Sequence, residues 1–251
     1  MKISMMWMTR KRSHELVYSL SSFIMNANNN KDIEYIVTAD PDDNETVTAL
    51  EKIVGMTCAN DAEITYCAAD KRYGYEELEA YQNLGASIFT GECLMVINDD
   101  VVCLKKGWDD NLRNELVKSI DKPVWIDAHI ACLGINRKWY ETVGSFAGSR
   151  ASDEYLRDLG IAANIDPLKP LMEIVHIQRG RDQIKFFKDG QQKIIPGLPD
   201  DGIGGYPTKT PKPPKYYHKT FHPSTHETNF IEGKKRFDND LTKLLGNVKN
   251  N

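Results

Sequence analysis

The stretch CLMVINDDV, residues 93–101, contains an apolar run that stops abruptly at polar residues. The large apolar side chains of residues 94–97 follow one another without a break, which is typical of a strand buried on both faces of a parallel sheet. Asn98, Asp99 and Asp100 come next. Adjacent carboxylates repel each other and resist desolvation. We therefore expect a compensating charge at this strand end, and a divalent cation is one candidate.

The segments before this stretch alternate between strand and helix patterns. Strands are predicted over 2–8, 33–40 and 63–70, and helices after an N-cap at Ser13, over 45–55 with an end at Gly55, and over 75–91. Short connections between such elements predict a parallel sheet with helices on its faces. Right-handed crossovers bring the carboxyl ends of the strands to one edge, where ligands bind in open α/β sheets.

The residues at that edge are the candidates for a ligand site. They are Thr9 to Arg12, Asp40, Asp70 to Arg72, and Asn98 to Asp100. Mg²⁺ and Mn²⁺ prefer oxygen ligands and are often held by one or two carboxylates plus substrate phosphates. His176, on a strand predicted over 171–177, would add an imidazole. Because Asp is also a common turn and cap residue, each aspartate taken alone has a purely structural alternative.

The pattern changes after Trp108. We predict a helix from there to about residue 120, a strand–turn–strand–helix unit over 123–146, and a helix that ends at Gly160. Pro and Gly become frequent from about residue 190, which favours a loop-rich segment with a weak helix over 237–245. The expected organisation is a domain over 1–190, with halves 1–105 and 106–190, and an extension over 191–251.

The composition is that of an ordinary soluble globular protein, with 41% hydrophobic and 27% charged residues and a net charge of −4. No apolar run approaches the ~20 residues of a membrane span, and the N-terminus does not resemble a secretion signal. The five cysteines lack CxxC spacing and are more typical of small buried side chains than of a zinc site or disulfides. A cytoplasmic location is expected.

Taken in order, these segments resemble a GT-A-fold nucleotide-sugar glycosyltransferase, close to glycosyltransferase family 2 and its small phage-encoded relatives. The resemblance covers residues 3–180. Its motifs are MTRKR (8–12), TADPDDNET (38–46), ADKRYGY (69–75), NLGASIFTGECLMVINDDV (83–101), KGWDDNL (106–112), CLGINRKWYETVGSF (132–146), SDEYLRDLG (152–160) and EIVHI (173–177). It implies an α/β, Rossmann-like, mixed but mostly parallel sheet flanked by helices, with an irregular C-terminal extension. For a phage-encoded protein, the location would be the host cytoplasm.

The resemblance also implies a role for each residue at the sheet edge. Residues 1–105 would bind a nucleotide-diphosphate sugar through Thr9, Arg10, Asp40, Lys71, Arg72 and Asp99. Among these, Asp40 would accept a hydrogen bond from the base. Asp100 and His176 would hold Mn²⁺ or Mg²⁺. Asn98 stands at the first position of the family's DxD motif, a departure that puts the second carboxylate ligand and the metal dependence in question.

Residues 106–190 would carry catalysis, and Asp153-Glu154 falls at the family's catalytic carboxylate. A base there would deprotonate an acceptor hydroxyl, and in-line attack on the anomeric carbon would invert it. We favour Asp153, expected at a helix N-terminus facing the crevice, with Glu154 as the alternative. SDE is also simply a good helix start.

The acceptor is less readable from the sequence. Trp139 lies where an acceptor would approach, although packing is the commoner role of tryptophan. Segment 206–219 is basic and aromatic, and Lys212, Lys215 and Tyr216 are its candidate contacts. Such a segment suits DNA, in keeping with phage relatives that glycosylate modified bases. It equally suits an anionic glycan, a lipid headgroup, a lid over the donor or a plain flexible tail.

Two other functions share the strand-end carboxylates. One is a nucleotidyltransferase, although no Gly-rich phosphate loop follows the first strand. The other is a non-catalytic module that binds nucleotide sugar or nucleic acid, an interpretation that Asn98 favours. The sequence does not indicate the sugar, the nucleotide or the oligomeric state.

Overall fold

The computed structural model describes residues 1–57, 61–74, 77–148, 152–179, 183–188, 191–196 and 227–248. Its strands are β1 (Ile3–Thr9), β2 (Ile33–Ala39), β3 (Glu63–Ala68), β4 (Cys93–Asn98), β5 (Val101–Cys103), β6 (Trp125–His129), β7 (Cys132–Asn136), β8 (Ile174–Arg179), β9 (Gln183–Lys188) and β10 (Gln191–Pro196). Its helices are α1 (Ser13–Asn26), the 3₁₀ turn η1 (Asn30–Asp32), α2 (Asn44–Thr57), α3 (Leu78–Ile88), α4 (Trp108–Val117), α5 (Arg137–Val143), α6 (Ser152–Ala162) and α7 (Glu227–Val248).

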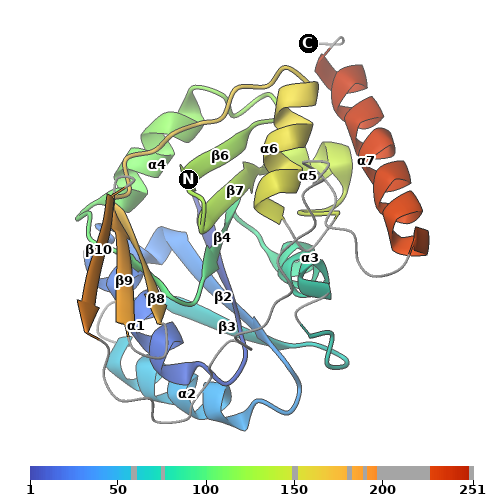
Figure 1. Cartoon of the computed structure of the whole chain (residues 1–251). Helices are drawn as coiled ribbons and strands as arrows, with labels where there is room; N and C mark the ends of the chain where they lie inside the picture. Colours follow the sequence, from blue (N-terminus) through green and yellow to red (C-terminus); the bar gives the residue numbers. More distant parts are fainter. Residues whose placement is uncertain are drawn as a thin grey trace.

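The central sheet has six strands in the order β3-β2-β1-β4-β7-β6 (Figure 1). The four strands β3, β2, β1 and β4 run parallel, whereas β7 is antiparallel to both β4 and β6. This arrangement confirms the predicted mixed, mostly parallel sheet. It also brings the ends of β1, β2 and β4, with the aspartates that follow β2 and β4, to one edge.

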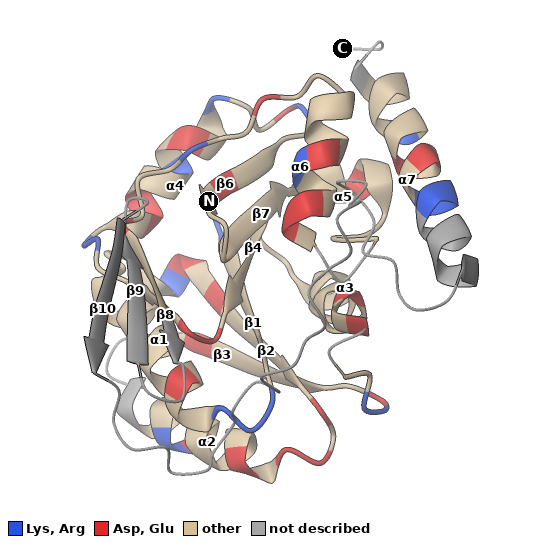
Figure 2. Ribbon diagram, in the orientation of Figure 1, with Lys and Arg blue, Asp and Glu red and all other residues tan. Residues whose placement is uncertain are grey.

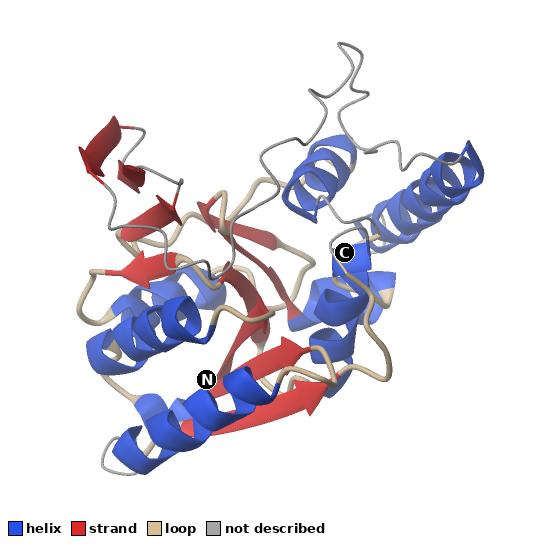
Figure 3. Ribbon diagram, turned by 60° about the horizontal axis from the view of Figure 1, so that its bottom comes forward, coloured by secondary structure: helices blue, strands red, loops and turns tan. Residues whose placement is uncertain are grey.

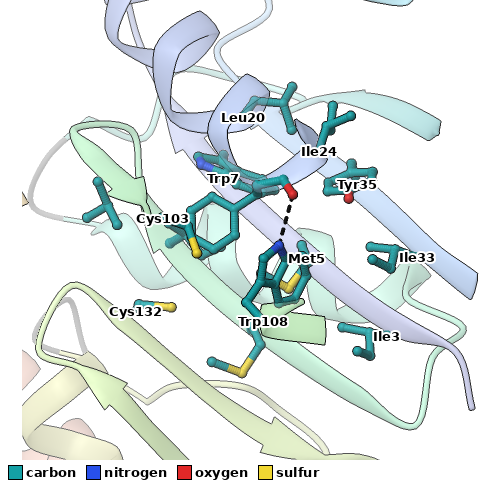
Figure 4. Packing of buried hydrophobic residues seen from close by; sticks show 14 of the residues in the cluster. Ile3, Met5, Trp7, Leu20, Ile24, Ile33, Tyr35, Cys103, Trp108 and Cys132 are labelled. Atoms are coloured by element: carbon teal, nitrogen blue, oxygen red, sulfur yellow. Dashed lines mark hydrogen bonds between the residues drawn. The ribbon is translucent and has the colours of Figure 1, made fainter. Parts of the chain in front are cut away.

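Both faces of the sheet are covered by helices, as Figure 3 shows. Alternate residues of β1 explain this: Ile3, Met5 and Trp7 join a core with α1, α2 and α4, while Met6 joins another with α3, α5, α6 and α7. Figure 4 shows part of the first core, where Trp7 and Trp108 pack beside α1. Burial on both faces is why the strands are continuous apolar runs.

A smaller sheet, β10-β9-β8-β5, determines where His176 lies. Its strand β5 begins directly after Asp100 and pairs antiparallel with β8, so that Val101 is opposite His176. Strands β9 and β10 pair antiparallel, with Gln191 opposite Lys188. The domain boundary at 190 stays a prediction.

The last helix, α7, is longer than the helix predicted over 237–245, and it packs on the main domain. The Tyr155 hydroxyl of α6 donates a hydrogen bond to Asp240 Oδ2 at 2.5 Å, and Lys243 Nζ donates to the Val143 carbonyl oxygen at 2.7 Å. Leu244 is fully buried. The described part of the extension is thus attached to α5 and α6 by both polar and apolar contacts.

Two glycines that we expected to end helices lie inside them. Helix α2 continues past Gly55 to Thr57, and α6 continues past Gly160 to Ala162. A β-carbon at Gly160 would clash with the indole of Trp125 on β6. This glycine is therefore explained by the close approach of α6 to the sheet, which no local sequence pattern reveals.

Two further expectations concern cysteines and membranes. Cys93, Cys103 and Cys132 are buried as expected, and Cys58 lies outside the described residues. Among the helices of the described ranges, none combines the length and apolarity needed to cross a membrane.

Candidate functional site

Asp99 and Asp100 follow β4 at the sheet edge and are both buried, with only 5% and 7% of their surface exposed. Arg12, from the segment after β1, bridges them. Its Nη1 donates to Asp99 Oδ1 at 2.6 Å and its Nη2 donates to Asp100 Oδ2 at 3.2 Å. A guanidinium suits this contact because its donors form a planar fork. Arg12 is thus one source of the compensating charge expected at this strand end.

Asp99 is the more deeply buried of the two carboxylates. Thr9, at the end of β1, donates its hydroxyl hydrogen bond to Asp99 Oδ2 at 2.9 Å. Burial nevertheless raises the pKa of Asp99 to about 7, an effect that Arg12 opposes and the negative charge of Asp100 reinforces. The protonation of Asp99 therefore changes close to neutral pH.

Asp100 also faces the imidazole of His176. The distance from Asp100 Oδ1 to His176 Nε2 is 3.1 Å. Burial opposes ionisation, but His176 and then Arg12 outweigh it and hold the pKa of Asp100 below its usual value. The ring of His129 lies edge-on to that of His176, with 6.0 Å between the centroids. Burial, and then the proximity of His176, lower the pKa of His129.

These residues can be tested as ligands for a divalent ion. Within the described ranges, Asp100 Oδ1 is a buried oxygen that accepts no hydrogen bond, although His176 lies within ion-pair distance. Across the described ranges, no group of three or more His, Cys, Asp and Glu side chains is arranged to hold a metal. Mg²⁺ usually takes only one or two protein carboxylates and completes its shell with water and phosphates. Asp100 and His176 therefore fit an ion that shares its remaining ligands with a substrate.

Asp40 follows β2 and is almost fully buried, with 1% of its surface exposed. Its two oxygens accept hydrogen bonds from the Tyr81 hydroxyl and the Arg10 guanidinium. Arg10 also donates to Asp42 Oδ1 at 3.1 Å. Figure 2 shows the basic segment after β1 near the acidic turn after β2. A ligand reaching this point meets the partly exposed Arg10 before it meets Asp40.

The segment after β3 contributes exposed basic side chains to the same edge. Lys71 and Arg72 are exposed, and the Lys71 ammonium lies 4.9 Å from the centroid of the Tyr73 ring. The backbone N–H of Tyr73 donates to the Tyr81 hydroxyl oxygen at 2.9 Å. Because Tyr81 also bonds Asp40, the segment containing Lys71 is tied to the end of β2.

Asp153 and Glu154 lie in the first turn of α6. Glu154 Oε2 is buried and accepts no hydrogen bond from the residues that the structure describes. Burial and, secondly, the charge of Asp153 raise the pKa of Glu154. Gln82 Nε2 of α3 donates to Ser152 Oγ at 2.8 Å, one residue before Asp153. Since Gln82 adjoins Tyr81, consecutive residues of α3 contact the start of α6 and Asp40.

Of the two roles considered for Trp139, the structure favours packing. It is fully buried in the core beneath α5, α6 and α7, so an acceptor cannot reach its ring in this structure. The bulky indole is explained by packing on that face of the sheet. Lys212, Lys215 and Tyr216 lie outside the described residues.

Three residues of the site were not assigned a role from sequence: Arg12, Tyr81 and Gln82. Arg12 stood among the strand-end candidates, and the basic run Arg10-Lys11-Arg12 was its signal. Tyr81 and Gln82 carry no such signal, because they lie within a helical pattern and their partners are distant in sequence.

Comparison with solved structures identifies proteins of similar architecture. A mannosyltransferase from Pyrobaculum calidifontis, solved in complex with GDP-Man and Mn²⁺, superposes with a TM-score of 0.54 at 14% identity, over 68% of this chain and 55% of that chain. The chain has the GT-A fold. It spans just over half the length of that mannosyltransferase, 55%.

Lower-scoring similarities to this GT-A chain include S. aureus TarS. TarS 1–349 gives a TM-score of 0.49 at 12% identity, covering 62% of this chain and 54% of that chain. Its complex with UDP-GlcNAc gives 0.42 at 15% identity, covering 50% and 33% respectively. No protein-family model matches the sequence, and no curated protein is significantly similar to it.

Proposed function

We propose that the protein is a metal-dependent, inverting glycosyltransferase that moves a hexose or pentose from a nucleotide-diphosphate sugar to an acceptor hydroxyl. The observation that carries this proposal is the buried pair Asp99-Asp100 at the carboxyl edge of a GT-A sheet, with His176 3.1 Å from Asp100. Two buried carboxylates facing basic side chains suit a site that handles cations and phosphates.

The donor side of the proposed site follows the sheet edge. Thr9 and Asp40, with Arg10 beside Asp40, would meet the base and ribose. Asp99 would meet the sugar or ribose, and Lys71 or Arg72 the nucleotide or diphosphate. Asp100 and His176 would hold Mn²⁺ or Mg²⁺, and the structurally similar mannosyltransferase was solved with GDP-Man and Mn²⁺. A bound divalent ion would stabilise the negative charge of the departing diphosphate.

On the acceptor side, we propose that Glu154 is the base. Its raised pKa and its buried oxygen, which accepts no hydrogen bond from the described part of the chain, suit a carboxylate that takes a proton from an acceptor hydroxyl. Asp153, which the sequence favoured, is the alternative one residue away. A single base with in-line attack on the anomeric carbon leads to inversion.

The test is release of nucleoside diphosphate from a panel of nucleotide sugars, measured with Mn²⁺ and with EDTA. We expect turnover with one donor class, its loss in EDTA, and its loss in Asp100→Ala. Glu154→Gln should retain donor binding and lower transfer about 10²–10⁴-fold, the usual contribution of a general base. Glu141→Gln, on an exposed side chain that pairs with Lys138, is the matched control.

Two outcomes would change this proposal. If Glu154→Gln transfers sugar normally while Asp153→Asn does not, the base is Asp153. If no donor is turned over and the wild type binds nucleotide sugar or DNA independently of Asp100, the protein is a binding module. A DNA acceptor stays a prediction from residues 206–219, which lie outside the described residues.

A further inference from the structure

Arg12 contacts the carboxylates with its side chain while its backbone is held elsewhere. The Arg12 carbonyl accepts a hydrogen bond from Leu16 N–H at 3.0 Å in the first turn of α1. The preceding residue, Lys11, has a φ of +50° and donates its N–H to Asp43 Oδ2 at 2.8 Å. The guanidinium can therefore change partners by side-chain rotation, without moving α1 or the end of β1.

A divalent ion on Asp100 would compete with this guanidinium. Asp100 uses Oδ2 for Arg12 and directs Oδ1 toward His176, so an ion held by Asp100 and His176 would share one small carboxylate with Arg12. Like charges at such distances in a buried site repel strongly, because the screening by water is weak there. The arrangement therefore favours one cation at a time on Asp100.

A displaced guanidinium has an obvious alternative partner at this edge. Arginine binds phosphate groups through two parallel hydrogen bonds, and the Arg12 side chain is 20% exposed, whereas the side chain of Asp99 is 6% exposed. A diphosphate that coordinates the ion on Asp100 would place its oxygens near the end of β4. Arg12 would then exchange a carboxylate partner for a phosphate partner and remain charge-paired throughout.

We propose that Arg12 is a partner-exchanging residue of the donor site, which competes with the divalent ion for Asp100 and moves onto the diphosphate when the ion binds. This inference rests on the proposed function, because it takes the donor to be a nucleotide diphosphate. It has a consequence for binding: the ion and the diphosphate bind cooperatively, and the cooperativity acts equally in both directions.

The test is a calorimetric titration of Mn²⁺ into wild type and Arg12→Gln, alone and in the presence of UDP or GDP. Arg12→Gln should bind Mn²⁺ alone about tenfold more tightly, ~1.4 kcal/mol, because the competitor is gone. It should also show a smaller gain in Mn²⁺ affinity on adding the nucleoside diphosphate. Arg113→Gln is the matched control, since Arg113 pairs with Asp109 and Asp110 of α4 and donates to the Met1 carbonyl oxygen just before β1; its affinity for Mn²⁺ should be unchanged with and without the diphosphate.

Several results would overturn the inference. If Arg12→Gln gains Mn²⁺ affinity equally with and without the diphosphate, Arg12 acts only as a fixed charge. Unchanged or weaker binding of Mn²⁺ alone would exclude competition, as would an absence of Mn²⁺ binding in both proteins. Arg12→Lys, which keeps the charge but cannot bridge both carboxylates, serves if Arg12→Gln does not fold; it should show the same two changes to a smaller degree. The proposed function is tested separately, by turnover of a nucleotide sugar, so failure of one proposal can be told from failure of the other.

Discussion

At the scale of single residues, the burial of Asp99 makes the stability of the protein depend on pH. Its pKa rises from 3.8 to about 7 on folding, mainly through burial. Between these values the folded state binds more protons than the unfolded state, so this group's stabilising contribution is complete below about pH 4 and is lost as the pH rises through 7. Asp99→Asn should therefore weaken the decline in unfolding free energy between pH 4.5 and pH 7.5.

Urea unfolding of wild type and Asp99→Asn at the two pH values measures this difference. Asp110→Asn provides the control, because Asp110 is exposed and lies at the start of α4. If the unfolding free energy changes equally with pH in wild type and Asp99→Asn, the ion pair with Arg12 keeps Asp99 ionised from pH 4.5 to pH 7.5.

For these residues, the sequence predicted their positions in the fold but not their side-chain partners. The positions of Asp40, Asp99 and Asp100 at strand ends followed from apolar runs that stop at polar residues. The ion-pair partner of Asp99 could not be predicted in this way. Arg12 is 87 residues away in the chain, and the basic run that contains it offers three possible partners. Burial of Trp139 was equally hidden, since tryptophan suits both cores and sugar sites.

At the scale of elements, the attachment of α7 depends on a buried polar contact. The Tyr155 hydroxyl donates to Asp240 Oδ2 at 2.5 Å, and only 2% of the Asp240 surface is exposed. Tyr155→Phe removes the donor and leaves a buried carboxylate with the more distant Lys243, 3.5 Å away. We expect a loss of about 1–3 kcal/mol in unfolding free energy.

Chemical denaturation measures this loss. Alanine variants of two leucines of α7, one buried and one exposed, test separately whether the helix packs as described. Leu244 is fully buried and Leu245 is 39% exposed. Leu244→Ala should cost about 2–5 kcal/mol and Leu245→Ala less than about 0.5 kcal/mol. Equal effects at both positions would contradict the docking of α7 described above.

Helical glycines give a second prediction at this scale. Gly160 of α6 faces the indole of Trp125, whereas Gly246 of α7 has open space around its missing β-carbon. Gly160→Ala should destabilise the protein by about 1–3 kcal/mol through overpacking. Gly246→Ala should stabilise it by about 0.5–1 kcal/mol through helix propensity. Thermal melting of the two variants distinguishes them, and a stabilised Gly160→Ala would show that α6 lies farther from β6.

These glycines also show why helix ends were harder to predict than strands. The strands β1, β2 and β4 were found from runs of mostly apolar residues, which strands buried on both faces require. Glycine at 55 and 160 resembled helix ends, yet neither ends its helix. The reason at Gly160 is a contact between distant segments, which propensity and capping patterns do not encode.

At the scale of the whole molecule, topology brings the candidate site together. Parallel pairing of β2, β1 and β4 collects Asp40, Thr9 and Asp99 at one edge, and the second sheet adds His176 opposite Val101. The parallel half was predictable from alternating elements. The antiparallel pairing of β8 with the three-residue β5 was not, because so short a strand has no periodicity to recognise.

The central claim is that this edge binds a nucleotide-diphosphate sugar together with a divalent ion. The most direct measurement is the thermal midpoint of wild type and Asp100→Ala against a panel of nucleoside diphosphates and nucleotide sugars, with and without Mn²⁺. A ligand of the native state at a hundredfold excess over its Kd adds about 2.7 kcal/mol. We predict a rise in the midpoint with one nucleotide class that requires both Mn²⁺ and Asp100. No rise with any donor, or a rise that persists in Asp100→Ala without Mn²⁺, would contradict the claim.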